Sequence, residues 1–485
     1  MKKNNILLGA LTIMLLVVSC SDDFIDVPSR NENSEEFFNS QEDYEKALIG
    51  AYDLLQSTYL NVMLGEIASD NTLAGGESAT DVPGIQEVDD MIHGATNQQL
   101  RDIWGWMFAG VNRANYILEF QDKTEFSGKE NIIGQAKFLR AYYYFELVKW
   151  FGDVPLAVDT RIQFGEQFVV ERTPKAQVYA QIEADLIAAA AALPATQNVV
   201  GRATKGAAQS LLGKVYVYQD KFEEAATVLA SAISGPYSLV TDYASIFEHV
   251  GENGSESIFE VQYTDVEGAG FDCLQCSEGN VAVGFNGIRQ YDGPTFDSGY
   301  SFNVPTQEVV DAFETGDIRK DVAILDIDAW NAANGSSSGE GYEHTGYFNR
   351  KYIARKGDLN TGDQNLTNPN NYRSIRLADV LLLAAEANNR KTPANDAQAL
   401  VYLNQVRQRA GLAALSVTGP DLRQAIEQER RVELVGEGHR FFDLVRTGAA
   451  SREIDGFVAG KHEVFPIPQI EIELAGSRWA QNPGY

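Results

Sequence analysis

Residues 212–232 read LGKVYVYQDKFEEAATVLASA, and this stretch decides the fold. It follows the tetratricopeptide pattern of about 34 residues, in which small side chains allow two antiparallel helices to approach closely. Gly213 and Tyr216 fall at expected positions of the first helix, and Ala225 and Leu229 fall at the small and bulky positions of the second. The sequence therefore predicts a pair of packed antiparallel helices.

The same helical pattern covers two long regions, about 42–233 and about 374–445, where apolar residues recur at three- and four-residue spacing. A second, looser helix pair lies in the later region, at 378–388 with 397–409. Repeats of this kind stack to bury a shared core. We therefore expect a mainly α fold of tetratricopeptide-like helix pairs, an α-α superhelix.

Two insertions interrupt the predicted repeats, at about 69–99 and about 237–372. Residues 251–300 hold nine glycines and are rich in Asn, Asp, Ser and Tyr, a composition typical of loops and short strands. Long insertions in a repeat fold emerge on one side of the stack, and they carry the sequence differences that set ligand specificity. The two insertions are therefore the predicted ligand-binding loops of a loop-rich half with short strands.

Residues 1–19 predict a lipoprotein signal peptide. A basic pair precedes the thirteen-residue apolar run 6–18, which is too short to span a membrane but fits an export signal. Residues 17–20 resemble a bacterial lipobox, which would place a diacylglyceryl group on the Cys20 thiol. The alternative is ordinary cleavage beside a chance cysteine. Residues 20–40 are polar and acidic, and we expect them to form an acylated tether.

Charge narrows the class of ligand. Without Lys2 and Lys3 the chain holds 37 basic and 68 acidic residues. Such an acidic surface repels phosphate backbones and anionic lipid, which disfavours nucleic acid as a partner. A neutral ligand is the simpler expectation.

Cys273 and Cys276 form a lone C-x-x-C pair. In an exported chain this spacing predicts a local disulfide, because two thiols cannot close a zinc site and no histidine stands at ligand spacing from them. Residues 358–363 resemble a calcium loop only vaguely, since the glycine comes one position early and the distal glutamate is absent. We expect a turn there, and no metal or cofactor in the protein.

Several ordered motifs along the chain belong together. They are Phe138–Tyr144 with Trp150–Pro155, Ile375–Leu382 with Ala385–Ala387, Glu429–Leu434 with Gly438–Arg446, Phe465–Pro468, and Gln481–Tyr485. In this order they resemble the SusD/RagB family of Bacteroidetes, from the lipidated cysteine to the last residue. The acidic pair after that cysteine resembles the surface-export signal of Bacteroidetes lipoproteins.

The resemblance implies a non-catalytic outer-membrane lipoprotein of polysaccharide utilisation and nutrient uptake, with one domain over residues 41–485. Such a protein captures an oligosaccharide at the cell surface and sits as a lid on a SusC-like TonB-dependent transporter. Its fold would be four tetratricopeptide-like helix pairs that support a variable, loop-rich half. The family does not fix the sugar.

Sugar binding needs flat aromatic faces beside short polar side chains. The stretch 289–302 supplies both, and Trp330 is the one tryptophan in the divergent half. Trp106 is rotated by about 200° from Trp104 on a helix, so it is either buried under the first insertion or exposed for stacking. For each aromatic the alternative is packing in a small core under the loops. The predicted ligand contacts are Asp70, Asn71, Trp106, Arg289, Tyr291, Phe296, Tyr300, Phe302, Trp330 and Arg373.

A neutral polysaccharide such as a β-glucan is the expected ligand, whereas alginate-like acids would require Arg289, Arg350 and Arg373 to converge. His439, with Asp443 four residues later, could be mistaken for part of a catalytic cluster. Charged residues at this helical spacing usually pair with each other, so we expect a structural role. Two alternatives stay open, a surface glycoside hydrolase and a scaffold that binds only protein.

Overall fold

The computed structural model describes residues 37–162, 170–266, 270–357, 366–476 and 478–485. The predicted signal peptide, Cys20 and most of the tether lie outside these residues, as does the calcium-like segment 358–363. Within the described ranges, no helix combines the length and the apolar character that crossing a bilayer requires.

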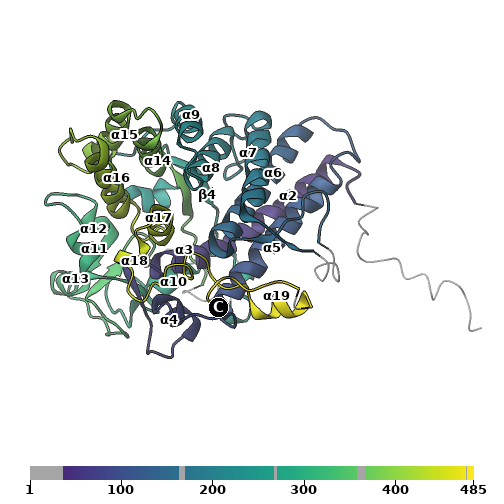
Figure 1. Ribbon diagram of the computed structural model, residues 1–485. Coiled ribbons are helices and arrows are strands. Elements are labelled where there is room, and N and C mark those ends of the chain that lie inside the picture. Colours follow the sequence, from purple (N-terminus) through teal and green to yellow (C-terminus); the bar gives the residue numbers. More distant parts are fainter. Residues whose placement is uncertain (1–36, 163–169, 267–269, 358–365, 477) are drawn as a thin grey trace, which may run out of the picture.

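A stack of helices forms the larger part of the molecule. Most helices in the stack pack against the next helix along the chain (Figure 1). The first part of the stack comprises α2 (Gln41–Asp53), η2 (Leu54–Thr58), α3 (Tyr59–Ile67), α5 (Gln98–Glu119), α6 (Lys129–Phe151), α7 (Lys175–Ala192), α8 (Lys205–Val217) and α9 (Phe222–Ile233). The second part comprises α14 (Leu377–Arg390), α15 (Asp396–Arg409), α16 (Gly419–Leu434), α17 (Arg440–Thr447) and α18 (Ala450–Glu453). Because α14 packs on α9, the two predicted helical regions form one continuous stack.

The α8–α9 pair confirms the prediction made from residues 212–232. Gly213 lies so close to Leu229 that a Cβ on the glycine would overlap the leucine side chain. Ala225 and Leu229 are both buried. The small residue therefore permits the close approach of the two helices, as the tetratricopeptide pattern requires.

Helix α14 begins later than the sequence predicts. The predicted helical region starts at residue 374, but residues Tyr372–Arg376 form strand β10 and the helix starts at Leu377. Strand β10 pairs antiparallel with β4 (Ser257–Val261), with Tyr372 opposite Val261. Backbone hydrogen bonds to a strand more than a hundred residues away override the local helical pattern.

The insertions contain short helices as well as the predicted strands. The first insertion holds β1 (Thr72–Gly75) and α4 (Pro83–Asp89). The second holds η4 (Tyr243–Phe247), η5 (His249–Gly251), β4, η6 (Phe271–Cys276), α10 (Ala282–Asn286), β5 (Ile288–Arg289), β6 (Ser298–Gly299), β7 (Phe302–Pro305), α11 (Gln307–Asp311), α12 (Lys320–Ala323), β8 (Ile324–Asp326), α13 (Ile327–Asn334) and β9 (Tyr347–Asn349). Figure 1 shows α11, α12 and α13 grouped at the lower left, away from α2, α5, α6 and α7 at the right.

Every sheet in the described residues has two strands. The pairs are β1 with β7, β10 with β4, β8 with β9, β5 with β6, and β2 (Val154–Pro155) with β3 (Arg172–Thr173). The last helix, α19 (Gln469–Leu474), lies beside α5, since its Glu471 and Leu474 line one pocket with Phe108 (Figure 1). Strands here tie loops to one another and form no layer of their own.

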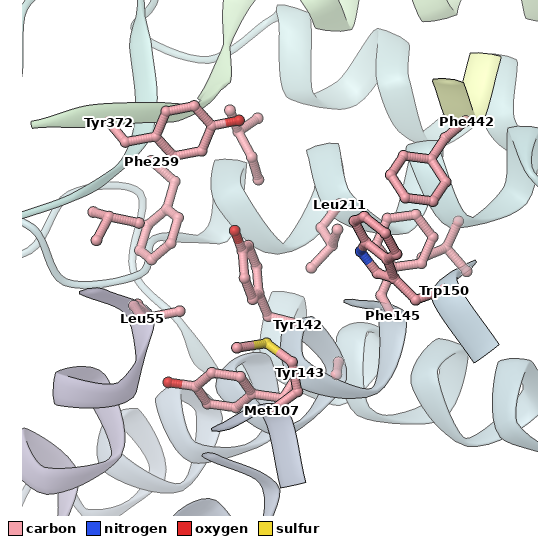
Figure 2. Packing of buried hydrophobic residues seen from close by; sticks show 14 of the residues in the cluster. Leu55, Met107, Tyr142, Tyr143, Phe145, Trp150, Leu211, Phe259, Tyr372 and Phe442 are labelled. Carbon is pink, nitrogen blue, oxygen red and sulfur yellow. The ribbon is translucent and has the colours of Figure 1, made fainter. Parts of the chain in front are cut away.

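Helix α6 runs through the main hydrophobic core (Figure 2). Tyr142 and Tyr143 point to different neighbours from the same helix, and Trp150 meets Phe442 edge to face with ring centres 5.0 Å apart. The Tyr143 hydroxyl donates to the Ala51 carbonyl at 2.7 Å, so the polar end of this buried ring is satisfied. The motif that includes these residues is therefore a core motif.

A buried ion network links the insertion half to the helical stack. Glu433 on α16 is fully buried and accepts hydrogen bonds from Arg319, Arg376 and Arg409. Arg376 also pairs with Glu437 at 2.8 Å. Three guanidinium groups around one carboxylate hold the pKa of Glu433 well below its usual range despite burial.

Candidate ligand-binding site

The two predicted ligand loops meet in one ladder. Strand β1 from the first insertion pairs antiparallel with β7 from the second, with Leu73 opposite Val304. Gly75 has a φ of +65°, and a Cβ there would overlap the Ser301 carbonyl oxygen, so glycine is required. The N–H of the next residue, Gly76, donates to that oxygen at 2.9 Å. The loops therefore form one surface element.

The backbone around this ladder holds left-handed conformations at residues other than glycine. Gln290, Ser301 and Asn303 have φ values of +51°, +57° and +58°. Each such residue costs of the order of 1–3 kcal/mol, and such strain gathers at ligand sites and switch regions. Their clustering within fourteen residues of the second insertion marks this segment as the candidate site.

Arg289 joins the two loops by charge. Its guanidinium donates to the Ser301 Oγ at 3.0 Å and to the Tyr300 carbonyl at 3.1 Å. The same group lies 3.7 Å from an Asp81 carboxylate oxygen and 4.0 Å from a Glu77 oxygen, both in the first insertion. Arg289 thus fixes the backbone that carries Tyr300.

A row of five aromatic side chains, here called the aromatic row, runs from η6 to α5. Its members in order are Phe271, Tyr300, Phe285, Tyr59 and Trp106. Successive ring centres lie 5.8, 5.8, 6.3 and 6.2 Å apart. Phe285 and Tyr59 are buried, Tyr300 and Trp106 are half-buried, and Phe271 is 56% exposed. Both ends of the row therefore reach the surface.

The α5 end of the row combines an aromatic face with a carboxyl group. Asp102 lies one turn before Trp106 and accepts a hydrogen bond from the Gln98 side chain at 2.6 Å. Burial raises the pKa of the Asp102 carboxyl. Gly105, also on this exposed part of α5, has no neighbouring atom within 4 Å of its Cβ position. A stacking face beside a hydrogen-bonding group suits a sugar ring.

Of the predicted contacts, Trp106 and Tyr300 belong to the aromatic row, where the buried rings of Phe285 and Tyr59 separate them, and Arg289 lies against the Tyr300 backbone. Sequence reasoning missed the exposed Phe271, and also the buried rings of Phe285 and Tyr59, which support the row from inside. Phe271 could have been suspected from the sequence, because it stands two residues before the C-x-x-C pair, whose disulfide would fix the position of a nearby ring. That pair is a disulfide in the structure, Cys273 to Cys276.

The aromatics around Trp330 form a separate small core, which corrects the prediction of Tyr291 and Phe296 as ligand contacts and is the alternative that the sequence left open for Trp330. Phe296 is fully buried, and its ring centre lies 5.0 Å from that of Trp330. The Arg350 guanidinium lies over the indole at 5.1 Å, and the indole N–H donates to the Tyr291 hydroxyl at 3.1 Å. Trp330 is half-buried, and Phe296 and the Arg350 guanidinium pack against its ring. Tyr291 and Phe296 are too buried to stack on a sugar.

Asp70 and Asn71 are anchors of the first insertion rather than surface groups, a second correction. The Asp70 carboxylate accepts two hydrogen bonds from Arg440, at 2.7 and 2.8 Å, and pairs with Arg431 at 3.0 Å. Asn71 is fully buried and bonds to Glu66 at 3.0 Å and to Arg431 at 2.9 Å. Internal partners therefore take the groups that a ligand would need.

Arg373 and Phe302 are also interior residues. Arg373 is 1% exposed and donates to the Glu248 carbonyl at 2.8 Å, while Phe302 packs on Phe285 with ring centres 5.5 Å apart. Arg350 instead donates to the Asp321 carbonyl at 2.6 Å. Because Arg373 is buried, it cannot join Arg289 and Arg350 in a patch at the surface, so the condition set for an alginate-like ligand is not met.

The charged residues around His439 pair with one another, as expected. Its Nδ1 lies 3.1 Å from the Lys214 Nζ, and burial, with the lysine charge, lowers the pKa of His439 to about 3. Asp443 pairs with Arg430 and Arg446. In the part of the chain that the structure describes, no three His, Cys, Asp or Glu side chains lie close enough to hold a metal ion.

Residues 335–339 read GSSSG and match the letters of the G-x-S-x-G motif of hydrolases. That motif needs a strand before the serine and a helix after it, so that the hydroxyl stands exposed on a sharp turn. Here Gly335 ends helix α13 with a φ of +61°, and Ser337 exchanges backbone hydrogen bonds with Asp292. The segment is a helix C-cap and not a nucleophile elbow.

Two family models match the chain. One, described as "SusD family", matches residues 325–463, and the other, described as "Starch-binding associating with outer membrane", matches residues 23–217. A relative from Formosa agariphila, SusD-like protein P2, is 28% identical and is matched over 98% of each chain. The family models leave out 218–324, where most of the aromatic row lies.

Solved structures match over nearly the whole chain. One described as a laminarin binding SusD-like protein is 35% identical, with a TM-score of 0.84 over 92% of this chain and 100% of that one. Surface glycan-binding protein A from Bacteroides thetaiotaomicron in complex with laminarihexaose is 28% identical, with a TM-score of 0.81 over 91% of this chain and 99% of that one.

Proposed function

Since the chain belongs to the SusD family, we propose that it is a cell-surface lipoprotein that binds a neutral β-glucan of the laminarin type and delivers it to a SusC-like TonB-dependent transporter. The observation that carries the proposal is the 35% identity, over 92% of the chain, to a structure described as laminarin-binding. Family membership alone supports glycan binding at the outer membrane. The finer choice of ligand rests on the match and on the site.

The chemistry of the site agrees with a neutral sugar. Trp106 and Tyr300 offer half-buried aromatic faces, and Asp102 offers a carboxyl group that can hydrogen-bond hydroxyls. The chain has a formal net charge of −29, so an anionic polysaccharide would meet repulsion. A neutral glucan requires no local basic patch.

Titration calorimetry of the mature chain without its lipid tests this proposal, with laminarihexaose as ligand and cellohexaose as a linkage control. We expect binding of laminarihexaose, and a loss of about 1–2 kcal/mol for Trp106→Ala. That loss raises Kd roughly five- to thirtyfold. Trp330→Ala is the matched control, since its indole packs under Arg350. Equal loss of affinity per folded molecule in both variants would place the site elsewhere.

The same samples test the hydrolase alternative. After long incubation with laminarihexaose, a reducing-end assay should find no new chain ends. A steady release of reducing sugar that survives repurification would make the protein an enzyme and overturn the proposal.

The lipid anchor and the transporter are tested in cells. Cys20→Ser should abolish lipid labelling and release the chain from the membrane fraction. Affinity capture of the lipidated chain from detergent-solubilised outer membranes should recover a TonB-dependent transporter at near-equal amounts. A lipidated chain that is captured alone would argue against the delivery role.

A further inference from the structure

We propose that the Cys273–Cys276 disulfide is a clamp that holds Phe271 as the outermost stacking platform for the oligosaccharide, so that reduction of this bond weakens binding. The inference rests on the proposed glycan-binding function. It assigns a positioning role to the disulfide and a ligand contact to Phe271, which is not among the contacts predicted from the sequence.

Phe271 has an unusual exposure for its type. Its ring is 56% exposed, and among the phenylalanines that the structure describes it is the one with an exposed side chain. The ring nevertheless meets Tyr300 edge to face, with centres 5.8 Å apart and planes at 66°. An exposed aromatic ring that continues a row of rings fits a surface for the apolar face of a sugar.

The disulfide closes the turn that carries this ring. Cys273 and Cys276 lie within η6 and are bonded across three positions. Leu274, between them, packs against the main core. Ser277, directly after them, donates from its hydroxyl to the Leu366 carbonyl at 2.7 Å. The C-terminal side of η6 is therefore anchored to the core.

Helix η6 begins directly after a glycine, and the Gly270 carbonyl accepts a hydrogen bond from the Cys273 N–H at 3.4 Å. Gly270 precedes Phe271 and has no neighbouring atom within 4 Å of its Cβ position. A glycine in open space restricts the chain least, so the conformation of Phe271 depends on the closed turn that follows it. Ordering a side chain or a backbone residue upon binding costs affinity, and the disulfide removes part of that cost in advance.

The chemistry of the test is specific to this bond. The chain has three cysteines, and the mature chain prepared without Cys20 has only Cys273 and Cys276. Dithiothreitol reduces the bond by two thiol–disulfide exchanges. One S–S bond breaks in the protein, two cysteine thiols form, and the dithiol becomes a cyclic disulfide. No other group in the protein takes part.

The experiment compares laminarihexaose affinity in the oxidised and reduced chains by titration calorimetry. We expect reduction to raise Kd about three- to tenfold, as expected for the loss of preorganisation at one or two residues. Phe271→Ala should bind weakly in both states and should not respond to dithiothreitol. Phe271→Trp should restore affinity and the response. Cys273→Ser with Cys276→Ser should reproduce the reduced protein in either buffer.

Trp106→Ala is the control at the other end of the aromatic row. It should bind weakly yet still lose a similar factor on reduction, because it leaves the clamp intact. Melting curves of the Phe271 and cysteine variants, in both states, should show the same main transition as wild type, since η6 is a surface turn. Trp106→Ala should melt earlier, because its ring packs on Tyr59, so its affinity is compared per folded molecule.

Different results would overturn the disulfide clamp and the proposed glycan-binding function. Laminarihexaose binding that ignores dithiothreitol in the wild-type chain would overturn the clamp and leave glycan binding in place. A Phe271→Ala chain that still responds to dithiothreitol would show that the bond acts through another residue, and would also overturn it. No binding by any form, oxidised or reduced, would defeat the proposed function itself.

Discussion

Alanine in place of Gly110 or Gly105 tests how tightly α5 and α6 pack. Both glycines lie within α5, so the two substitutions share a helix and a chemistry. A Cβ at Gly110 would lie 2.6 Å from three atoms of the Tyr143 ring. At Gly105 the same Cβ meets no atom within 4 Å.

The expected magnitudes follow from these surroundings. Alanine is favoured over glycine in a helix by about 1 kcal/mol, so Gly105→Ala should raise the free energy of unfolding by about 0.5–1 kcal/mol. At Gly110 the ring of Tyr143 cannot retreat easily, because it is fully buried and its hydroxyl is tied to the Ala51 carbonyl. Overpacking costs about 1–3 kcal/mol, and a strained buried hydrogen bond adds to this. We expect a net loss of about 2 kcal/mol for Gly110→Ala.

Urea unfolding followed by tryptophan fluorescence measures both changes in one series. A double variant, Gly110→Ala with Tyr143→Leu, should recover part of the loss, because the smaller side chain makes room for the Cβ. Equal unfolding free energies for the two single variants would refute the packing argument. A Gly110→Ala loss that Tyr143→Leu does not relieve would place the clash elsewhere.

Three further predictions concern the ion network, the first insertion and the small core. Glu433→Gln should lower the free energy of unfolding by about 3–5 kcal/mol, because three arginines lose a buried carboxylate, whereas Glu453→Gln in a surface pair should change it little in the same urea series. Burial, with Glu343 and Asp90 nearby, raises the pKa of Asp89 to about 8. The folded state therefore holds this proton more tightly than the unfolded state, and stability falls as pH rises from about 4 to 8. Asp89→Asn should remove that part of the pH dependence, so the gain in urea midpoint over wild type should be larger at pH 9 than at pH 5. Trp330→Ala should cost about 3 kcal/mol of stability and leave laminarihexaose affinity per folded molecule unchanged, as thermal melts beside calorimetry would show.

Helix pairs could be predicted because their signal is local. Gly213 and Leu229 stand sixteen positions apart in a repeating pattern, and their spacing already implies the contact found in the structure. The start of α14 could not be predicted in this way. Strand β10 owes its conformation to β4, and nothing near residue 374 reports on that distant partner.

The burial of the site aromatics was also beyond prediction from local sequence, because it depends on distant neighbours. Phe296 and Tyr300 are four residues apart in one loop and carry similar rings, yet the first is fully buried and the second half-buried. The difference is set by Trp330, which covers the first ring, and by the row that leads from the second to α5. The composition of the sequence could identify the loop as a candidate for ligand binding, but it could not show which aromatic ring in that loop is exposed.

Asp70 illustrates why polar residues mislead as well. In sequence it is an acidic residue in a loop, a typical ligand contact. Its partner Arg440 lies 370 residues further along the chain, in the motif Gly438–Arg446. The family resemblance already accounted for that motif. The pairing of the two could be found only in three dimensions.

The β4–β10 pairing closes the base of the segment between these two strands. This segment, here called the cassette, could therefore be exchanged as a unit. Tyr372 lies opposite Val261, so the segment between these strands leaves and re-enters the helical stack at neighbouring points. A graft from a relative would therefore need to match one strand pair at its base. The β1–β7 ladder adds a second condition, because Leu73 faces Val304 across the two loops. A transplant of the proposed ligand specificity should therefore carry β1 with the cassette.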